Sequence, residues 1–307
     1  MQNIVLTGAT SMIGIAIIKE ALISGKNVAA IVRKGSSRLC YLDALGSNKN
    51  LSIIECDIDN YNSLKLDTSY DTFFHLAWKN TDSESRDDVY AHASNIMYTI
   101  DAVEAARNAG CSVFVFAGSQ AEYGRVNEKL SGETICNPES GYGVAKYAAG
   151  KMARLLSAKY NLRYCHARIL STYGEGMGDG ALIMYLINTM LSGNKPSLTK
   201  CEQLWDFQYV EDTAKAMLSV AENGHDGKIY PIGNGIARPL CDYIEITRDI
   251  IDPSLHLDFG EKDYYPHQAM YLCADINELQ ADTGFEPCVS FEDGIRKMID
   301  WVIHTRE

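Results

Sequence analysis

Residues 3–14 read Asn3-Ile4-Val5-Leu6-Thr7-Gly8-Ala9-Thr10-Ser11-Met12-Ile13-Gly14, and this stretch decides the fold of the chain. A β-branched run leads into a turn of small residues, and an apolar-periodic segment follows as far as Gly25. The pattern predicts a strand, a tight turn and a helix. Gly8 permits the tight turn, and Gly14 allows the helix to pack closely on the strand.

A turn of this kind directs backbone N–H groups and the positive end of a helix toward one point, which suits a pyrophosphate. Ser11 stands where the usual dinucleotide-binding pattern has its middle glycine, and its small hydroxyl side chain can donate to a phosphate. A lone glycine motif is equally compatible with an ordinary strand-to-helix turn. The remainder of the chain therefore has to decide between the two.

The bulk composition restricts the classes of protein that fit. The 307 residues are 46% hydrophobic and 22% charged, as in soluble globular proteins of about one or two domains. A net charge of −12 argues against nucleic acid or an anionic membrane as a general partner. The nine cysteines form no Cys-x-x-Cys pair, and we recognise no signal peptide or membrane-spanning run. We expect a cytoplasmic protein with reduced thiols, mostly in the core, and no structural metal.

The second predicted strand, 27–32, ends at Arg33, and Arg38 lies nearby in the sequence. In a dinucleotide-binding fold this strand end faces the adenosine ribose. An acidic residue there favours NAD, whereas an arginine accommodates the 2′-phosphate of NADP. No acidic residue is present between 33 and 38, so the sequence favours NADP and leaves NAD open. The same arginines are compatible with a solvated basic loop.

The third and fourth predicted strands end in residues suited to the same ligand. Asp57 can accept a hydrogen bond from an adenine amino group while Ile58 packs on the ring, or Asp57 can simply cap the segment that follows. Ala77 is small enough for the chain to pass close to a cofactor. His75, within an apolar run, is expected to be a core histidine rather than a base.

Predicted strands alternate with predicted helices through the first part of the chain. Several of the strands are continuous apolar runs, which is typical of a parallel sheet covered by helices on both faces. The sequence therefore predicts an α/β protein with a Rossmann-type doubly wound parallel sheet of about six or seven strands. Besides the first, the strands of this part are predicted at 27–32, 51–56, 72–78, 111–117 and 162–168.

Two segments carry the predicted chemistry. The strand at 111–117 exits into Ser119, and a later small-residue helix presents Tyr142 and Lys146, four residues apart on one face. A tyrosine hydroxyl has an ordinary pKa of about 10. An ammonium group one turn away is expected to lower that pKa, which favours proton transfer. Ser119 would hold a substrate oxygen against the Tyr142 hydroxyl. The spacing alone is common on helix surfaces, but its combination with the serine and the glycine turn is specific.

With these residues in place, the chain resembles the extended short-chain dehydrogenase/reductase family of NAD-dependent epimerases/dehydratases, many of which modify nucleotide sugars. The resemblance covers nearly the whole chain in the family's order. The segments that carry it are 7–14, Asp57-Ile58, His75-Leu76-Ala77, Asn95, Gly118-Ser119, Tyr123-Gly124, Tyr142, Lys146, Arg168, Tyr173-Gly174, Asp206-Phe207, Tyr209-Val210-Glu211-Asp212, Ile232-Gly233-Asn234, Ala274-Asp275 and Gly284-Phe285-Glu286-Pro287.

The resemblance implies that Ser119, Tyr142 and Lys146 are the catalytic residues. It also implies an NAD(P)-binding Rossmann domain over 1–170, with returning segments near 203–232, and a smaller C-terminal substrate-binding lobe over 171–307. Together with the arginines above, the expected cofactor contacts are Gly8, Ser11, Met12, Ile13, Gly14, Arg33, Arg38, Asp57, Ile58, Leu76, Ala77, Trp78 and Lys146.

The departures from the family lie on the substrate side. Ser171 stands in place of a usual asparagine, Trp205 in place of an arginine, and Tyr265, by spacing, in place of a second phosphate-binding arginine. Two lost arginines would remove charge-assisted phosphate bonds. Arg238 and Lys262 are the nearest cations in sequence, so either these hold a pyrophosphate or the substrate is not a nucleotide sugar.

Gln120 and Ala121 occupy the positions where the 4,6-dehydratases of the family carry Asp and Glu, so dehydration is not expected and Gln120 is expected to line the substrate pocket. The sequence favours a nucleotide-sugar 4-keto-reductase that uses NADPH. A nucleotide-sugar epimerase with tightly held NAD(P) and a reductase of a non-nucleotide ketone remain open, whereas related NADP sensors typically lack the Tyr/Lys pair. The expected partner is a small molecule, and the chain is expected to act alone or as a homodimer.

Overall fold

The computed structural model describes residues 1–46, 48–66, 69–82, 84–264 and 268–306. Its centre is a seven-stranded sheet in the order β10-β6-β5-β4-β1-β2-β3, in which every neighbouring pair is parallel. The predicted α/β class and parallel sheet are therefore confirmed. The strands are β1 (Asn3–Thr7), β2 (Asn27–Val32), β3 (Leu51–Glu55), β4 (Thr72–His75), β5 (Val113–Ser119), β6 (Arg163–Ile169) and β10 (Ile229–Ile232).

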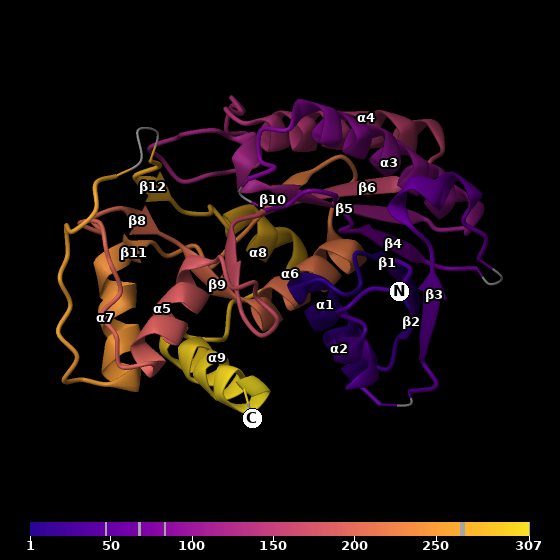
Figure 1. Cartoon of the computed structure of the whole chain (residues 1–307). Coiled ribbons are helices and arrows are strands. Elements are labelled where there is room, and N and C mark those ends of the chain that lie inside the picture. Colours follow the sequence, from indigo (N-terminus) through magenta and orange to yellow (C-terminus); the bar gives the residue numbers. More distant parts are fainter. Residues whose placement is uncertain (47, 67–68, 83, 265–267, 307) are drawn as a thin grey trace.

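Each face of this sheet supports its own core. Alternate residues of a strand point to opposite faces, so Ile4 and Leu6 join one cluster while Val5 joins the other. α1 (Met12–Ile23) and α6 (Val210–Asn223) cover the first face; α3 (Val89–Asn108) and α4 (Gly141–Lys159) cover the second. Figure 1 shows α3 and α4 together on one side of the sheet, with α1 and α6 on the other.

The strand order reverses between β1 and β4, because the chain builds β1, β2 and β3 outward and then returns to the other side of β1. In open parallel sheets, ligands bind outside the carboxyl ends of the strands at such a reversal. The turn after β1, the chain after β4 and the exit of β5 all meet at this edge. The fold thus places the predicted cofactor and catalytic segments beside one another.

Most of the remaining elements lie beyond the β10 end of the sheet in Figure 1 and are called the lobe, while one helix, Asn277–Thr283, packs against α6 and β10. One small sheet has the order β11-β8-β12, and a second pairs β7 with β9. The elements are β7 (Ser171–Tyr173), α5 (Leu182–Leu191), β8 (Leu204–Trp205), β9 (Phe207–Tyr209), β11 (Arg238–Pro239), α7 (Leu240–Ile251), β12 (Tyr271–Leu272), α8 (Asn277–Thr283) and α9 (Phe291–Arg306). Three short helical turns complete the first part: α2 (Cys40–Asp43), η1 (Ile58–Ser63) and η2 (Gln120–Glu122).

The cysteines are less buried than the sequence suggests. All nine are free thiols, but only Cys111, Cys165, Cys201 and Cys273 are buried. The expectation of mostly core cysteines is wrong because the others lie in loops or at element ends, where water reaches the thiol. Within the described ranges, no cluster of three or more His, Cys, Asp or Glu side chains is arranged to hold a metal ion. No helix in the same part of the chain combines the length and apolarity that crossing a membrane requires.

Candidate active site

The glycine turn leaves no room for a side chain at either glycine. Gly8 has φ +70°, and a Cβ there would lie 2.8 Å from the Ala77 nitrogen. A Cβ on Gly14 would lie 2.4 Å from the Gly8 carbonyl oxygen. The chain at Leu76 and Ala77 therefore passes directly against the turn, as the small size of Ala77 suggests.

Ser11 caps the helix that follows the turn. Its Oγ accepts a hydrogen bond from the Gly14 N–H at 3.0 Å, so the hydroxyl hydrogen remains able to donate to a ligand. Met12 and Ile13 form the start of α1 and are partly exposed. The first N–H groups of a helix have no partner inside it, and here they lie at the carboxyl edge of the sheet, because α1 follows the end of β1.

Arg33 and Arg38 differ in how the structure holds them. The Arg33 side chain is exposed and makes no hydrogen bond or ion pair with the part of the chain that the structure describes. The Arg38 guanidinium donates to the Gly176 carbonyl oxygen at 2.5 Å and packs over the Tyr41 ring at 5.2 Å. Arg38 thus ties the loop after β2 to the loop after β7.

Asp57 and Ile58 lie at the end of β3. The Asp57 carboxylate accepts a hydrogen bond from the Lys34 backbone N–H at 3.1 Å, and Ile58 is buried. The alternative role of Asp57 as a helix cap is not found, because its side chain makes no capping bond to the turn that follows. His75 is a core residue as expected: Thr7 and Thr99 satisfy its ring nitrogens, and burial lowers its pKa to about 3.

Tyr142 and Lys146 lie on α4 and meet Trp78, which follows the Ala77 segment. The Lys146 ammonium is buried, donates to the Ala117 carbonyl oxygen at 2.8 Å and lies 4.0 Å from the Trp78 ring centroid. The Tyr142 ring packs edge-on against Trp78 at 6.0 Å, and its centroid is 5.9 Å from the Lys146 nitrogen. Ser119 ends β5 two residues after Ala117, and its side chain interacts with Tyr142. The structure therefore brings the three predicted catalytic residues together beside the glycine turn.

The acidity of this group differs from the prediction. Burial raises the pKa of Tyr142, while the Ser119 side chain and the positive charge of Arg86 act in the opposite direction. Lys146 does not supply the expected lowering of the Tyr142 pKa. Its own pKa is lowered to about 7, because burial outweighs the attraction of the Glu122 carboxylate.

Three residues at this site are not among those predicted from the sequence. The Arg86 guanidinium carbon lies 5.4 Å from the Tyr142 ring centroid, and the buried His92 ring packs edge-on against Tyr142 at 5.6 Å. Arg86 belongs to a polar loop and His92 to the first turn of α3, so neither gives a periodic signal. Glu122 does have one: Ser119-x-x-Glu122 is a capping box, and both of its hydrogen bonds form.

On the substrate side, the predicted residues have partners within the protein. The Trp205 indole N–H donates to the Ser171 hydroxyl at 2.7 Å. Arg238 forms an ion pair with Glu292 at 3.0 Å. Gln120 is partly exposed in η2, next to Ser119. Tyr265 lies outside the residues that the structure describes.

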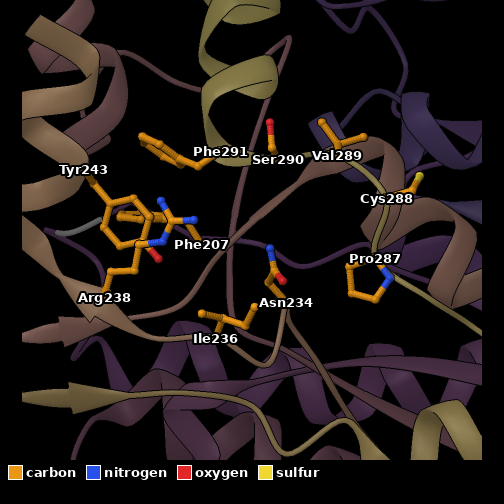
Figure 2. A pocket seen from close by; sticks show the side chains of 10 residues that line it. All are labelled: Phe207, Asn234, Ile236, Arg238, Tyr243, Pro287, Cys288, Val289, Ser290 and Phe291. Atoms are coloured by element: carbon orange, nitrogen blue, oxygen red, sulfur yellow. The ribbon is translucent and has the colours of Figure 1, made fainter. Parts of the chain in front are cut away.

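Arg238 lines a pocket of about 250 Å³ that is shown in Figure 2. Its guanidinium lies near the aromatic rings of Phe207 and Tyr243, under the start of α9. None of Ser119, Tyr142 and Lys146 lines this pocket. Lys262, the other predicted cation, lies elsewhere: its backbone N–H donates to Leu198, and its ammonium is 6.0 Å from the Tyr185 ring centroid.

Known proteins with similar sequences and structures agree with this geometry. The model of the NAD dependent epimerase/dehydratase family matches residues 4–233, and the chain belongs to that family. A putative UDP-glucose 4-epimerase of Methanocaldococcus jannaschii is 26% identical, over 97% of this chain and 98% of that protein. A dTDP-4-dehydro-6-deoxyglucose reductase of Escherichia coli is 28% identical, over 74% and 71%.

Among solved structures, a UDP-N-acetylglucosamine 4-epimerase from Methanobrevibacter ruminantium, in complex with UDP-N-acetylmuramic acid, has a TM-score of 0.88 with 25% identity. The alignment covers 99% of both chains. The family and the doubly wound fold predicted from the sequence are therefore confirmed.

Proposed function

We propose that the protein is an NAD-dependent nucleotide-sugar epimerase that inverts the configuration at C4 of the sugar. The observation that carries this proposal is the convergence of Ser119, Tyr142 and Lys146 against Trp78, directly beside the Gly8–Gly14 turn. Both the M. jannaschii relative and the M. ruminantium structure are described as 4-epimerases, which supports epimerisation over the keto-reduction that the sequence alone favours.

The turn fits a dinucleotide because Gly8 and Gly14 let the backbone come close to a ligand and the first N–H groups of α1 have no partner within the helix. We assign Gly8, Ser11 to Gly14, Asp57, Ile58, Leu76 to Trp78 and Lys146 to its contacts. NAD, when bound, supplies an acceptor for the hydride from the sugar carbon and returns that hydride. The expected NADP preference gains no support: the family is described as NAD dependent, and the Arg38 guanidinium is already bonded to Gly176.

The residues of this chain would act on the sugar hydroxyl. Tyr142 takes its proton as the carbon is oxidised and gives the proton back on reduction. Ser119 donates a second hydrogen bond to the same oxygen and stabilises its negative charge. The Lys146 ammonium would bond the cofactor. The charge of Arg86 opposes the effect of burial on the Tyr142 pKa and assists this step.

We further propose that the pyrophosphate of the substrate is held near Lys262 rather than Arg238. Arg238 is already paired with Glu292, whereas no carboxylate of the described residues lies within ion-pair distance of Lys262. Trp205 and Ser171, which bond to each other, would form the wall of this part of the site.

A second copy of the chain is the one macromolecular partner we propose. Val144, Met152 and Leu155 lie along α4 and are 52%, 47% and 74% exposed, which is unusual for apolar residues on one helix. A homodimer would cover them. Size-exclusion chromatography with light scattering tests this, since a monomer at micromolar concentration would exclude it.

A keto-reductase is the second candidate, and it is favoured by the identity to the E. coli reductase. The two are separated by incubating the protein with NAD and either UDP-glucose or UDP-N-acetylglucosamine, and analysing the products by NMR. We expect the C4 epimer of one of them, with the cofactor acting catalytically. Reduction of dTDP-4-dehydro-6-deoxyglucose with stoichiometric use of NADPH, and no epimer from either sugar, would favour the reductase.

A further inference from the structure

Glu122 is a fully buried carboxylate directly behind the candidate active site, and its polar contacts are with groups in the protein interior. It lies in η2, the turn that follows Ser119, and none of its surface is exposed. Its Oε1 accepts the Ser119 backbone N–H at 2.8 Å and lies 3.1 Å from His166 Nε2. Its Oε2 accepts from Arg168 Nε at 2.8 Å.

The fold makes room for this cluster with two glycines. A Cβ on Gly118 would lie 2.2 Å from His166 Nε2 and 2.5 Å from Glu122 Oε1. A Cβ on Gly150, one turn after Lys146 on α4, would lie 2.5 Å from His166 Cε1. The cluster therefore fills the contact between β5, β6 and the helix that carries Tyr142 and Lys146.

The charges within the cluster can be assigned. Burial raises the pKa of Glu122, but the hydrogen bonds from His166 and the Ser119 N–H, together with the charge of Arg168, outweigh burial and lower it. Burial lowers the pKa of His166, so we take the imidazole as neutral at neutral pH and Arg168 as the cation that balances Glu122. A buried anion consequently lies behind the site throughout the physiological range.

We propose that Glu122 is a positioning residue: its carboxylate fixes the backbone at Ser119 and places a buried negative charge behind the strand end whose Ala117 carbonyl oxygen holds the Lys146 ammonium. This inference rests on the proposed function, since it concerns how the same three residues are prepared for hydride transfer. Each role follows from a separate feature of Glu122. The length of its side chain allows the hydrogen bond to Ser119, and its negative charge favours the charged form of Lys146.

The charge effect has to be judged against every ionisable group around Lys146. Within the described part of the chain these are Glu122 from η2, Tyr142 from α4, His75 from β4 and His166 from β6. The two histidines are neutral at neutral pH because burial lowers their pKa values, and Tyr142 is protonated. Glu122 is therefore the group whose negative charge favours the lysine ammonium.

Two variants separate the effect of the Glu122 charge from the effect of its side-chain length. Glu122→Gln keeps the volume and an oxygen that can accept from Ser119 but removes the charge. Glu122→Asp keeps the charge but withdraws the acceptor by one methylene. Glu139→Gln is the matched control, because it removes an exposed carboxylate that pairs with Arg125 in the neighbouring loop.

The measurement is the affinity for NAD, determined by calorimetry as a function of pH. The same measurement on Lys146→Met identifies the part of the pH profile that is caused by titration of Lys146. Glu122→Gln should move the midpoint of that part down by about one pH unit. Glu122→Asp should leave the midpoint in place and lower turnover of the sugar by about 10–100-fold, because Ser119 is displaced. Glu139→Gln should change neither quantity.

A folded Glu122→Gln variant with the wild-type midpoint would overturn the proposal, as would an equal shift in Glu139→Gln. If Glu122→Gln alone does not fold, Glu122→Gln combined with Arg168→Gln removes both buried charges and is judged by the same midpoint. The NAD titration needs no sugar. A shifted midpoint without any epimer formation would therefore reject the proposed function while supporting the role of Glu122.

Discussion

The half of the molecule built on the large sheet and the lobe differ in where their polar side chains point. In the first region, Tyr142, Lys146 and Ser119 converge on one place, beside a turn in which Gly8 and Gly14 leave no room for a Cβ. In the lobe, the Trp205 indole bonds to the Ser171 hydroxyl and Arg238 pairs with Glu292. The first region therefore gathers groups that can act on a ligand, whereas these polar groups of the lobe bond to the protein itself.

The largest effect is expected at Tyr142. Tyr142→Phe removes the proton donor and acceptor and should lower turnover by about 10²–10⁴-fold. NAD affinity should hardly change, because the hydroxyl is directed at the sugar. Tyr147→Phe, on the same helix, is the control and should retain wild-type turnover. If both variants have the same activity, Tyr142 is not the catalytic residue and the large-sheet half does not hold the active site.

A comparably large effect, on stability, is expected at the buried ion pair behind Ser119. Arg168→Met leaves Glu122 unpaired in the interior and should lower the free energy of unfolding by about 3–5 kcal/mol. Arg125→Met breaks the exposed pair with Glu139 and should cost no more than about 1 kcal/mol. Urea denaturation of both variants measures the difference. Equal losses would show that burial does not set the cost of this pair.

Much of the first half follows from the sequence because local patterns suffice there. The predicted strand at 27–32 is found at these residues, and the predicted strand at 72–78 ends early, at His75. It ends early because Leu76 and Ala77 leave the sheet to pass against Gly8. That contact joins segments far apart in the chain, which no local pattern records.

The candidate site could likewise be predicted only where local sequence patterns reveal its residues. Tyr142 and Lys146 share a helix face, so their spacing reveals them. Arg86 and His92 reach Tyr142 only through tertiary packing, and the raised pKa of Tyr142 results from burial that spacing does not show. The same limit applies to Arg238, whose partner Glu292 lies more than fifty residues further along the chain.

An intermediate effect is expected in the lobe. Lys262→Met should raise the KM for a UDP-sugar by about tenfold or more, because a charged hydrogen bond to phosphate contributes about 1.5–3 kcal/mol. Arg238→Gln should leave the KM unchanged, since that guanidinium pairs with Glu292. Steady-state kinetics of the two variants tests the assignment. A larger effect at Arg238 than at Lys262 would reverse it.

The smallest effect is expected at Arg33, whose exposed side chain makes no polar contact with the described residues. Arg33→Ala should change NAD affinity by about 0.5 kcal/mol or less, as is usual for surface positions. Calorimetric titration with NAD and with NADP gives the comparison. A large and selective loss of NADP affinity would restore the preference for NADP that the sequence suggests.

The central claim is reversible oxidation of the sugar at C4 with the cofactor recycled in each turnover. The most direct test supplies UDP-glucose that carries deuterium at C4, together with NAD, and follows the label by NMR and mass spectrometry. We expect a C4 epimer that keeps its deuterium, with no build-up of reduced cofactor. An unchanged sugar, or a product formed only with stoichiometric consumption of NADPH, would contradict it.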